Sequence, residues 1–324
     1  MRYRKALKIL EATLAIEANH PQLLPSLPLK KEVKSLLTDF RKVEEIPFSS
    51  HVDGCILIEN AQEKASYERI GNKVKFRGPF LRLNDEASDL RFGLWGNQGF
   101  LYRFVLYLLE KKHHIYNFHA CALYQQEKDR LLVIMGGAGS GKTVCLLSGL
   151  TKGLKLYSTE TVHFRLRQKK VTWFMGSVFD NVRWGTLIHH FPQFLPEQKT
   201  PQRGKEWQHK TALDLSPFQH SEEKLVNPRS VTILFPRIEE GRKGFLFYPV
   251  KDSKKAAKAL FDNLSQKLVE TTLLYDHIPV LGLEEKKMAE SRLRVANNLV
   301  HHETLTEIAY VLSNPSDCWG NLLS

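Results

Sequence analysis

Residues 131–150 read LLVIMGGAGSGKTVCLLSGL, and this stretch decides the fold of the chain. Its first five residues are apolar, which is typical of a buried strand. Residues 136–143 fit the pattern G-x-x-x-x-G-K-[ST] of a phosphate-binding loop. Residues 144–150 are mostly apolar and predict the start of a helix. The stretch therefore predicts a strand, a glycine-rich loop and a helix in direct succession.

Each residue type in this loop suits a bound phosphate group. Glycine lets the backbone turn tightly and bring its N–H groups close to phosphate oxygens. Lys142 can reach the β- and γ-phosphates, Thr143 can offer its hydroxyl to Mg²⁺, and the helix directs its positive end at the anion. The alternative is a glycine-rich turn without a ligand. The predicted nucleotide-binding residues are Gly136, Gly137, Ala138, Gly139, Ser140, Gly141, Lys142 and Thr143.

Composition and charge limit the possible classes of protein. The chain has 324 residues, of which 42% are hydrophobic and 25% charged, so it can bury a sizeable core. Its net charge of +12 favours anionic partners. The lysines and arginines are nevertheless scattered in short clusters, and no basic motif interleaved with aromatic residues is present. The sequence therefore does not favour nucleic acid as a partner.

The four cysteines and the N-terminal residues bear on the compartment. The cysteines are widely spaced without a C-x-x-C pair, which predicts neither a zinc site nor a disulfide scaffold and fits a reducing compartment. Lys8 and Glu11 interrupt the apolar residues near the start, so we expect no signal peptide. No apolar run approaches the length of a membrane span. We therefore expect a cytoplasmic protein without a membrane anchor.

The hydrophobic pattern outside the loop predicts the other elements and three parts of the chain. These parts are an N-terminal α+β segment (1–96), a nucleotide-binding domain (97–265) and a C-terminal helical segment (266–324). Residues 176–229 contain five prolines and are expected to be rich in loops. The predicted helical regions are residues 1–45, 97–112, 251–264 and 283–312, and the predicted strands are residues 55–58, 74–76, 80–83, 90–94, 115–123, 154–157, 162–166, 171–175, 231–235 and 244–250.

A family resemblance rests on the order of three motifs. Phe118-His119-Ala120 precedes the strand and loop, and Ser158-Thr159-Glu160 follows the next predicted strand. Over about residues 97–265 this order resembles the catalytic domain of bacterial HPr kinase/phosphorylase. The resemblance implies an α/β fold with a P-loop kinase domain of the HPr kinase/phosphoenolpyruvate carboxykinase type. It also implies ATP and Mg²⁺ as cofactors and transfer of the γ-phosphoryl group to a hydroxyl.

The resemblance also implies roles for particular residues. Glu160, His119 and Lys142 fall on catalytic positions, and Thr143 and Glu160 fall on the Mg²⁺ site. Thr159 stands where the family has the first aspartate of an acidic pair, so one carboxylate is left to hold metal or to position the nucleophile. Two hypotheses follow. The chain is a kinase for a protein, peptide or small-molecule hydroxyl, or it is a non-catalytic ATP-binding regulatory or scaffold protein.

A few further residues carry weaker signals. Arg183 and Lys210 lie in the loop-rich region, where cations can stabilise a transferred phosphate. His163 is expected on the polar surface of its strand. The sequence names neither the acceptor nor the oligomeric state, and a homo-oligomer stays an open alternative. Two pairs of adjacent histidines do not predict a metal site, because adjacent helical residues face different ways; these are His189-His190 and His301-His302.

Overall fold

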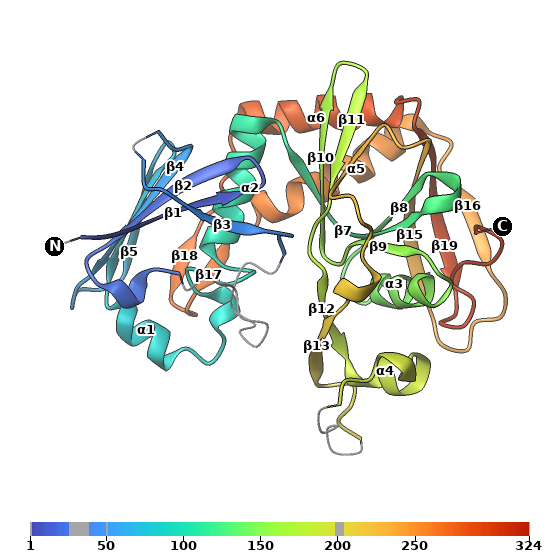
Figure 1. Cartoon of the computed structure of the whole chain (residues 1–324), viewed down its shortest axis with the longest axis horizontal. Coiled ribbons are helices and arrows are strands. Elements are labelled where there is room, and N and C mark those ends of the chain that lie inside the picture. Colours follow the sequence, from blue (N-terminus) through green and yellow to red (C-terminus); the bar gives the residue numbers. More distant parts are fainter. Residues whose placement is uncertain (1, 26–38, 50, 198–203, 324) are drawn as a thin grey trace. The chain divides into compact units, whose positions relative to one another are not determined.

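The computed structural model describes residues 2–25, 39–49, 51–197 and 204–323 and is a mixed α/β structure (Figure 1). The chain forms two compact units. The first contains Met1–Tyr116 and Ser265–Glu290, and the second contains Asn117–Leu264 and Ser291–Ser324. This division differs from the predicted boundaries at 96/97 and 265/266, because the helix predicted over residues 97–112 belongs to the first unit and the C-terminal residues join the second.

The first unit is built on a six-stranded sheet with the order β3-β1-β2-β4-β6-β5. The helices α1 (Phe80–Glu86) and α2 (Phe100–His113), two short 3-10 helices (Pro21–Leu23 and Leu90–Phe92) and the hairpin of β17 (Thr272–Leu274) and β18 (Ile278–Val280) complete it. The sheet strands are β1 (Tyr3–Ile9), β2 (Ala12–Ala18), β3 (Val43–Ile46), β4 (Gly54–Asn60), β5 (Ser66–Ile70) and β6 (Lys73–Gly78).

The helical prediction for the N-terminus is wrong in the part that the structure describes. Leu7 and Leu14, whose spacing suggested one helical face, are buried partners across the β1–β2 hairpin. Leu10 lies at the turn with a φ of 54°. Spacing alone could not distinguish a helix from a hairpin here, because a tight hairpin also brings residues seven apart together. Most of the second predicted helix, including Leu36 and Leu37, lies outside the described residues.

Two strand predictions in this unit are also wrong. The predicted strand over residues 80–83 lies in α1, where Phe80 and Leu83 are buried with the i, i+3 spacing of a helix. The predicted strand over residues 90–94 contains a 3-10 helix, whose N-terminus is capped by the Asp89 side chain. The strands predicted at residues 55–58 and 74–76 lie in β4 and β6, and the helix predicted at residues 97–112 is α2.

The second unit contains a nine-stranded sheet with the order β14-β11-β10-β7-β8-β15-β19-β16, in which β9 also pairs with β7. The central strands β8, β15 and β19 are parallel, and β7 and β16 flank them antiparallel. The strands are β7 (Tyr116–Gln125), β8 (Arg130–Met135), β9 (Lys155–Ser158), β10 (Thr161–Arg167), β11 (Lys170–Phe174), β14 (Lys224–Val226), β15 (Ser230–Ile238), β16 (Leu246–Pro249) and β19 (Leu305–Ser313).

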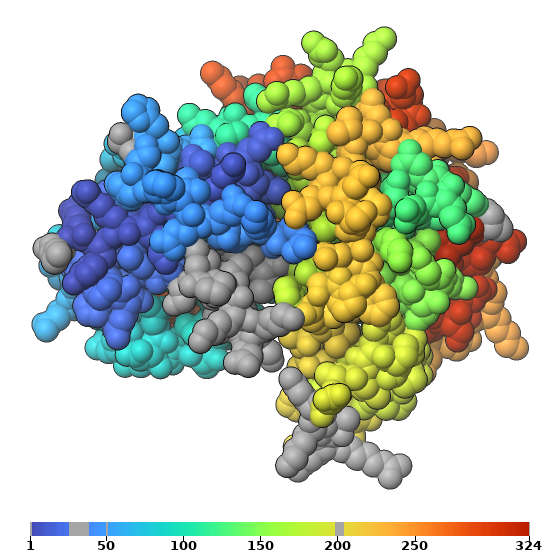
Figure 2. Space-filling model, in the orientation of Figure 1, coloured from blue at the N-terminus to red at the C-terminus, as the bar shows by residue number. Residues whose placement is uncertain are grey.

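Much of the predicted pattern in this unit is confirmed. The strands predicted around the glycine-rich loop are β7, β8, β9, β10 and β11, and the later ones are β15 and β16. The helix predicted from residue 251 is α5 (Ser253–Val269). The loop-rich region holds short elements, namely β12 (Phe179–Arg183), α4 (Trp184–His190), β13 (Lys210–Asp214) and β14. The β12–β13 pair and α4 form an arm that extends from the sheet (Figure 1, Figure 2).

The helix predicted over residues 283–312 is wrong in its second half. The helix α6 covers Lys286–Val300, and β19 follows as a strand between β15 and β16. Ile308, Ala309 and Val311 are buried in this strand. An interior strand with both faces partly covered lacks a clean alternation of polar and apolar residues, so its apolar positions read as a continuation of the preceding helix.

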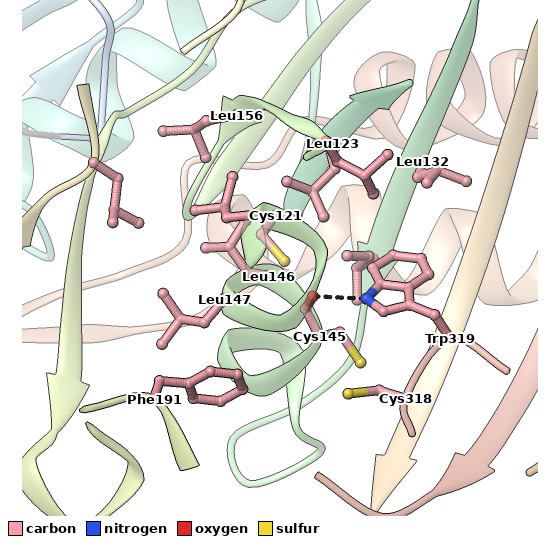
Figure 3. Close-up of a cluster of buried hydrophobic side chains, with 14 of the residues drawn as sticks. Cys121, Leu123, Leu132, Cys145, Leu146, Leu147, Leu156, Phe191, Cys318 and Trp319 are labelled. Carbon is pink, nitrogen blue, oxygen red and sulfur yellow. Dashed lines mark hydrogen bonds between the residues drawn. The ribbon is translucent and has the colours of Figure 1, made fainter. Parts of the chain in front are cut away.

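The core of the second unit fixes the helix that follows the glycine-rich loop (Figure 3). This helix, α3 (Lys142–Thr151), buries Leu146 and Leu147 against the sheet, and each fully buried leucine contributes about 1.5–3 kcal/mol. Gly149 permits this close approach, because a Cβ atom there would lie 2.2 Å from Leu123 Cδ1. Trp319 Nε1 donates a 3.2 Å hydrogen bond to the Cys145 carbonyl oxygen. No helix of the described residues is both long and apolar enough to cross a membrane.

Candidate functional site

Residues 136–143, called the glycine loop below, connect the end of β8 to the start of α3. The loop therefore lies at the carboxyl edge of the parallel strands, where α/β sheets bind their ligands. Gly141 has a φ of 97°, and a Cβ atom there would lie 2.4 Å from Ile238 Cγ1, so the loop requires glycine at this position. The Ile238 N–H donates a 3.1 Å hydrogen bond to the Ser140 carbonyl oxygen, which ties the loop to β15.

The side chains of Lys142 and Ser140 lie close to the backbone of the glycine loop. Lys142 Nζ donates to the carbonyl oxygens of Gly136 (2.5 Å) and Gly137 (3.2 Å), so its positive charge lies over the loop. Ser140 Oγ is buried and has no hydrogen-bond partner among the described residues. The ten residues of α3 begin at Lys142, so the positive end of the helix dipole adds to this charge. The arrangement suits an anionic ligand.

The structure brings His119 of β7 next to Glu160, which lies in the turn between β9 and β10. His119 Nε2 is 3.7 Å from Glu160 Oε2, and both side chains are partly buried. The Ala120 N–H donates a 3.1 Å hydrogen bond to the Glu160 carbonyl oxygen, which fixes the turn against β7. Asn263 of α5 fixes the backbone of His119, because it accepts from the His119 N–H at 2.9 Å and donates to the His119 carbonyl oxygen at 3.3 Å. Two of the predicted catalytic residues thus form one cluster.

Sequence reasoning missed Asp180, which is buried near the start of β12. Burial and the negative charge of Glu160 raise the pKa of Asp180 well above its usual range, although hydrogen bonding from Thr143 and the positive charge of Lys210 lower it. Asp180 Oδ2 is buried and has no hydrogen-bond partner in the described part of the chain. The only signal in the sequence is a single carboxylate within the apolar stretch GSVFDNV, which no motif marks.

The other predicted residues lie outside this cluster or act on it from a distance. Arg183 donates a hydrogen bond to the Trp207 carbonyl oxygen on the arm. Lys210, the partner of Arg183 in the β12–β13 register, is close enough for its charge to lower the pKa of Asp180. The expected surface position of His163 is wrong: this side chain is fully buried, and burial lowers its pKa to about 3, which keeps the ring neutral.

The two histidine pairs make contacts of other kinds. The His189 ring stacks on Trp207 with ring centroids 5.7 Å apart. His302 Nδ1 is 2.9 Å from Thr304 Oγ1, and its Nε2 is 3.2 Å from the Lys169 carbonyl oxygen. These contacts give the His189 and His302 rings a structural role.

The residues around Asp180 fit a magnesium ion that is held together with phosphate oxygens. No three His, Cys, Asp or Glu side chains of the described residues lie close enough together to bind a metal ion by themselves. Mg²⁺ usually takes one or two carboxylates, and substrate phosphates and water supply its other ligands. Asp180, Glu160 and Thr143 supply such a partial set, and the unpartnered Asp180 Oδ2 is an oxygen that a cation would satisfy.

The fold and the site together define a mixed α/β protein with a glycine loop beside two acidic side chains, Glu160 and Asp180. No protein-family model matches the chain, and no curated protein matches it. One solved structure to which it is similar is the HPr(Ser) kinase/phosphatase from Coxiella burnetii. The match has 10% sequence identity and a TM-score of 0.22, and it covers 56% of this chain and 94% of that one. At this level the match assigns no role to any residue, so the functional argument rests on the site itself.

Proposed function

We propose that the protein is an ATP-dependent kinase that transfers the γ-phosphoryl group to a hydroxyl of a protein, peptide or small molecule, in the manner of HPr kinase/phosphorylase. One observation carries the proposal. Glu160 Oε2 lies 3.7 Å from His119 Nε2, and both Glu160 and the Thr143 hydroxyl at the end of the glycine loop act on the pKa of the buried Asp180 carboxyl. Phosphoryl transfer requires such acidic groups next to a phosphate site.

In this proposal the glycine loop holds the phosphates of ATP. Its backbone N–H groups and the Lys142 ammonium would bind phosphate oxygens, and Thr143, Glu160 and Asp180 would hold Mg²⁺. When bound, Mg²⁺ neutralises negative charge on the transferred group. A bound cation next to Asp180 would favour the charged form of its carboxyl. The residues that the sequence predicted and the one that it missed thus serve one site.

The acceptor hydroxyl loses its proton as its oxygen bonds to the γ-phosphorus and the bond to the β-phosphate oxygen breaks. Glu160 or His119 takes that proton, because both groups lie at the same point of the site, with 3.7 Å between Glu160 Oε2 and His119 Nε2. ADP and the phosphorylated acceptor are the products. Asn263 keeps the backbone of His119 in place during this exchange.

The alternative is a non-catalytic ATP-binding regulatory or scaffold protein, and the neutral Thr159 beside Glu160 favours it. Incubation of the protein with γ-labelled ATP, Mg²⁺, metabolite pools and cell lysate separates the two functions. A kinase forms a labelled product that depends on Glu160 and is absent with Glu160→Gln. ATP binding without any labelled product or ADP would support the alternative.

A further inference from the structure

A cavity of about 580 Å³ adjoins the glycine loop on the side of β15. Gly136, Gly137 and Ser140 of the loop form part of its wall, and aromatic side chains of three neighbouring strands form another part. The volume lies within the range of roughly 300–1,000 Å³ that is usual for small-molecule sites. The cavity therefore opens directly from the phosphate-binding surface.

The aromatic side chains form a row across the sheet, which we call the aromatic row: Phe235, Tyr310 and Tyr248. Phe235 of β15 pairs with Tyr310 of β19, and Tyr310 pairs with Tyr248 of β16. The rings of Phe235 and Tyr310 have centroids 5.4 Å apart. Tyr310 is 47% exposed and Tyr248 51% exposed, which is unusual for large rings next to each other on a sheet.

The aromatic row begins at the same level of the sheet as the glycine loop. Leu234 pairs with Ile134 in the register of β15 and β8, so Phe235 is level with Met135, the last residue before the loop. The row is also held to the loop, because the Ile238 N–H of β15 bonds to the Ser140 carbonyl oxygen. Ser140 forms part of the cavity wall, and its Oγ atom is buried beneath that wall, where it would lie 2.5 Å from a Cβ atom at Gly136.

The sheet order places the His119–Glu160 pair and the aromatic row on opposite sides of the glycine loop. His119 lies on β7 and Glu160 follows β9, which pairs with β7, whereas the row lies on β15, β19 and β16. The strand β8, which carries the loop, runs between these two groups of strands. Because the γ-phosphate must face Glu160, the other end of a bound nucleotide extends toward the row.

We propose that this cavity binds the purine base and ribose of the nucleotide, with the base stacked on Tyr310 and its neighbours. The inference rests on the proposed function, since it presupposes that the phosphates bind the glycine loop. Stacking on an aromatic ring suits a base because every base has a flat π-face.

Titration calorimetry with ATP and with inorganic tripolyphosphate, each with Mg²⁺, tests this assignment. Wild-type protein should bind ATP more tightly than tripolyphosphate. Tyr310→Ala should weaken ATP binding about tenfold and leave tripolyphosphate binding unchanged, because only ATP carries a base. Tyr310→Phe keeps the ring and should bind ATP like the wild type. Leu246→Ala changes an exposed residue of β16 outside the cavity wall and is the matched control.

Three other results would overturn the proposal. Unchanged ATP affinity in both Tyr310→Ala and Tyr248→Ala would show that the cavity holds another ligand. Equal losses for ATP and tripolyphosphate would show that the change disturbs the loop itself. Wild-type protein that binds neither compound would instead defeat the proposed function, which makes that failure distinguishable from a failure of the base site alone.

Discussion

The hydroxyl of Thr159 donates a 2.6 Å hydrogen bond to the carbonyl oxygen of Phe179, the residue before Asp180. The Thr159 N–H also donates to the Ser177 carbonyl oxygen at 2.9 Å. Thr159 is buried, so it joins the turn that carries Glu160 to the strand that carries Asp180. In the sequence, Thr159 stands where the resemblance implies an aspartate. In the structure, Thr159 instead holds the start of β12, which carries the carboxyl of Asp180.

Replacement of Thr159 tests this relationship. An ionised Asp at this position cannot donate to the Phe179 carbonyl oxygen, and an unsatisfied buried acceptor costs about 1–3 kcal/mol. It also adds a negative charge beside Glu160 and the buried carboxyl of Asp180. We expect Thr159→Asp to lower both the thermal midpoint and the turnover, and Thr159→Ser, which keeps the donor, to stay close to the wild type. A silent wild type that Thr159→Asp activates would favour the non-catalytic alternative.

Replacement of Lys142 tests the phosphate site. Lys142→Ala removes the only side-chain cation of the glycine loop, and a hydrogen bond to a charged group is worth about 1.5–3 kcal/mol. We therefore expect the affinity for Mg-ATP to fall at least about tenfold in a folded protein. Lys152→Ala, at the exposed C-terminal end of the same helix, should bind like the wild type. Calorimetry that finds equal affinities for both variants would exclude the loop as the phosphate site.

Replacement of Asp180 tests the raised pKa of its carboxyl. In the folded protein this group stays protonated at pH values where the unfolded chain, with a pKa near 3.9, already ionises. Stability is therefore lost as the pH rises from about 4 toward the folded pKa. Asp180→Asn cannot ionise, so its gain in unfolding free energy over the wild type should grow between about pH 4 and about pH 7 and level off above that. Urea denaturation without Mg²⁺ measures this difference.

The control for that experiment is Asp262→Asn, an exposed carboxyl on α5. Its stability relative to the wild type should change little over the same range, because exposed ion pairs contribute at most about 1 kcal/mol. A difference for Asp180→Asn that is constant with pH would show that the carboxyl is ionised in the folded protein. The same variant should lose turnover, since Asn offers no negative charge to Mg²⁺.

Local signals were enough to predict the glycine loop and its flanking elements. Residues 131–150 carry the apolar strand, the glycines and the helix start in one continuous stretch, and β8 and α3 follow that pattern. The predictions failed where pairing partners decide the structure. Leu7 and Leu14 form a hairpin instead of a helical face, and β19 becomes a strand because β15 and β16 lie on both of its sides.

In the candidate site, too, the residues with local sequence signals were predicted and the residue placed by a distant contact was missed. Lys142 and Thr143 belong to a motif, and the resemblance placed His119 and Glu160, which the structure brings to 3.7 Å. Asp180 lies near Thr143 in the folded chain, where Thr159 ties the turn between β9 and β10 to the start of β12. No periodicity in the sequence records a contact between residues so far apart, so the second carboxylate becomes visible only in the folded chain.

Replacement of Glu160 separates binding from chemistry. Glu160→Gln keeps the shape of the side chain, removes its charge and leaves the loop amides and Lys142, the proposed phosphate ligands, unchanged. We expect turnover to fall about a hundredfold or more and ATP affinity to change much less, because a group that transfers a proton contributes about 10²–10⁴ in rate. Glu206→Gln, a carboxylate beside His189 on the arm, is the matched control and should keep both values. Equal losses in turnover and affinity would identify Glu160 as a binding residue, and unchanged turnover would remove it from the site.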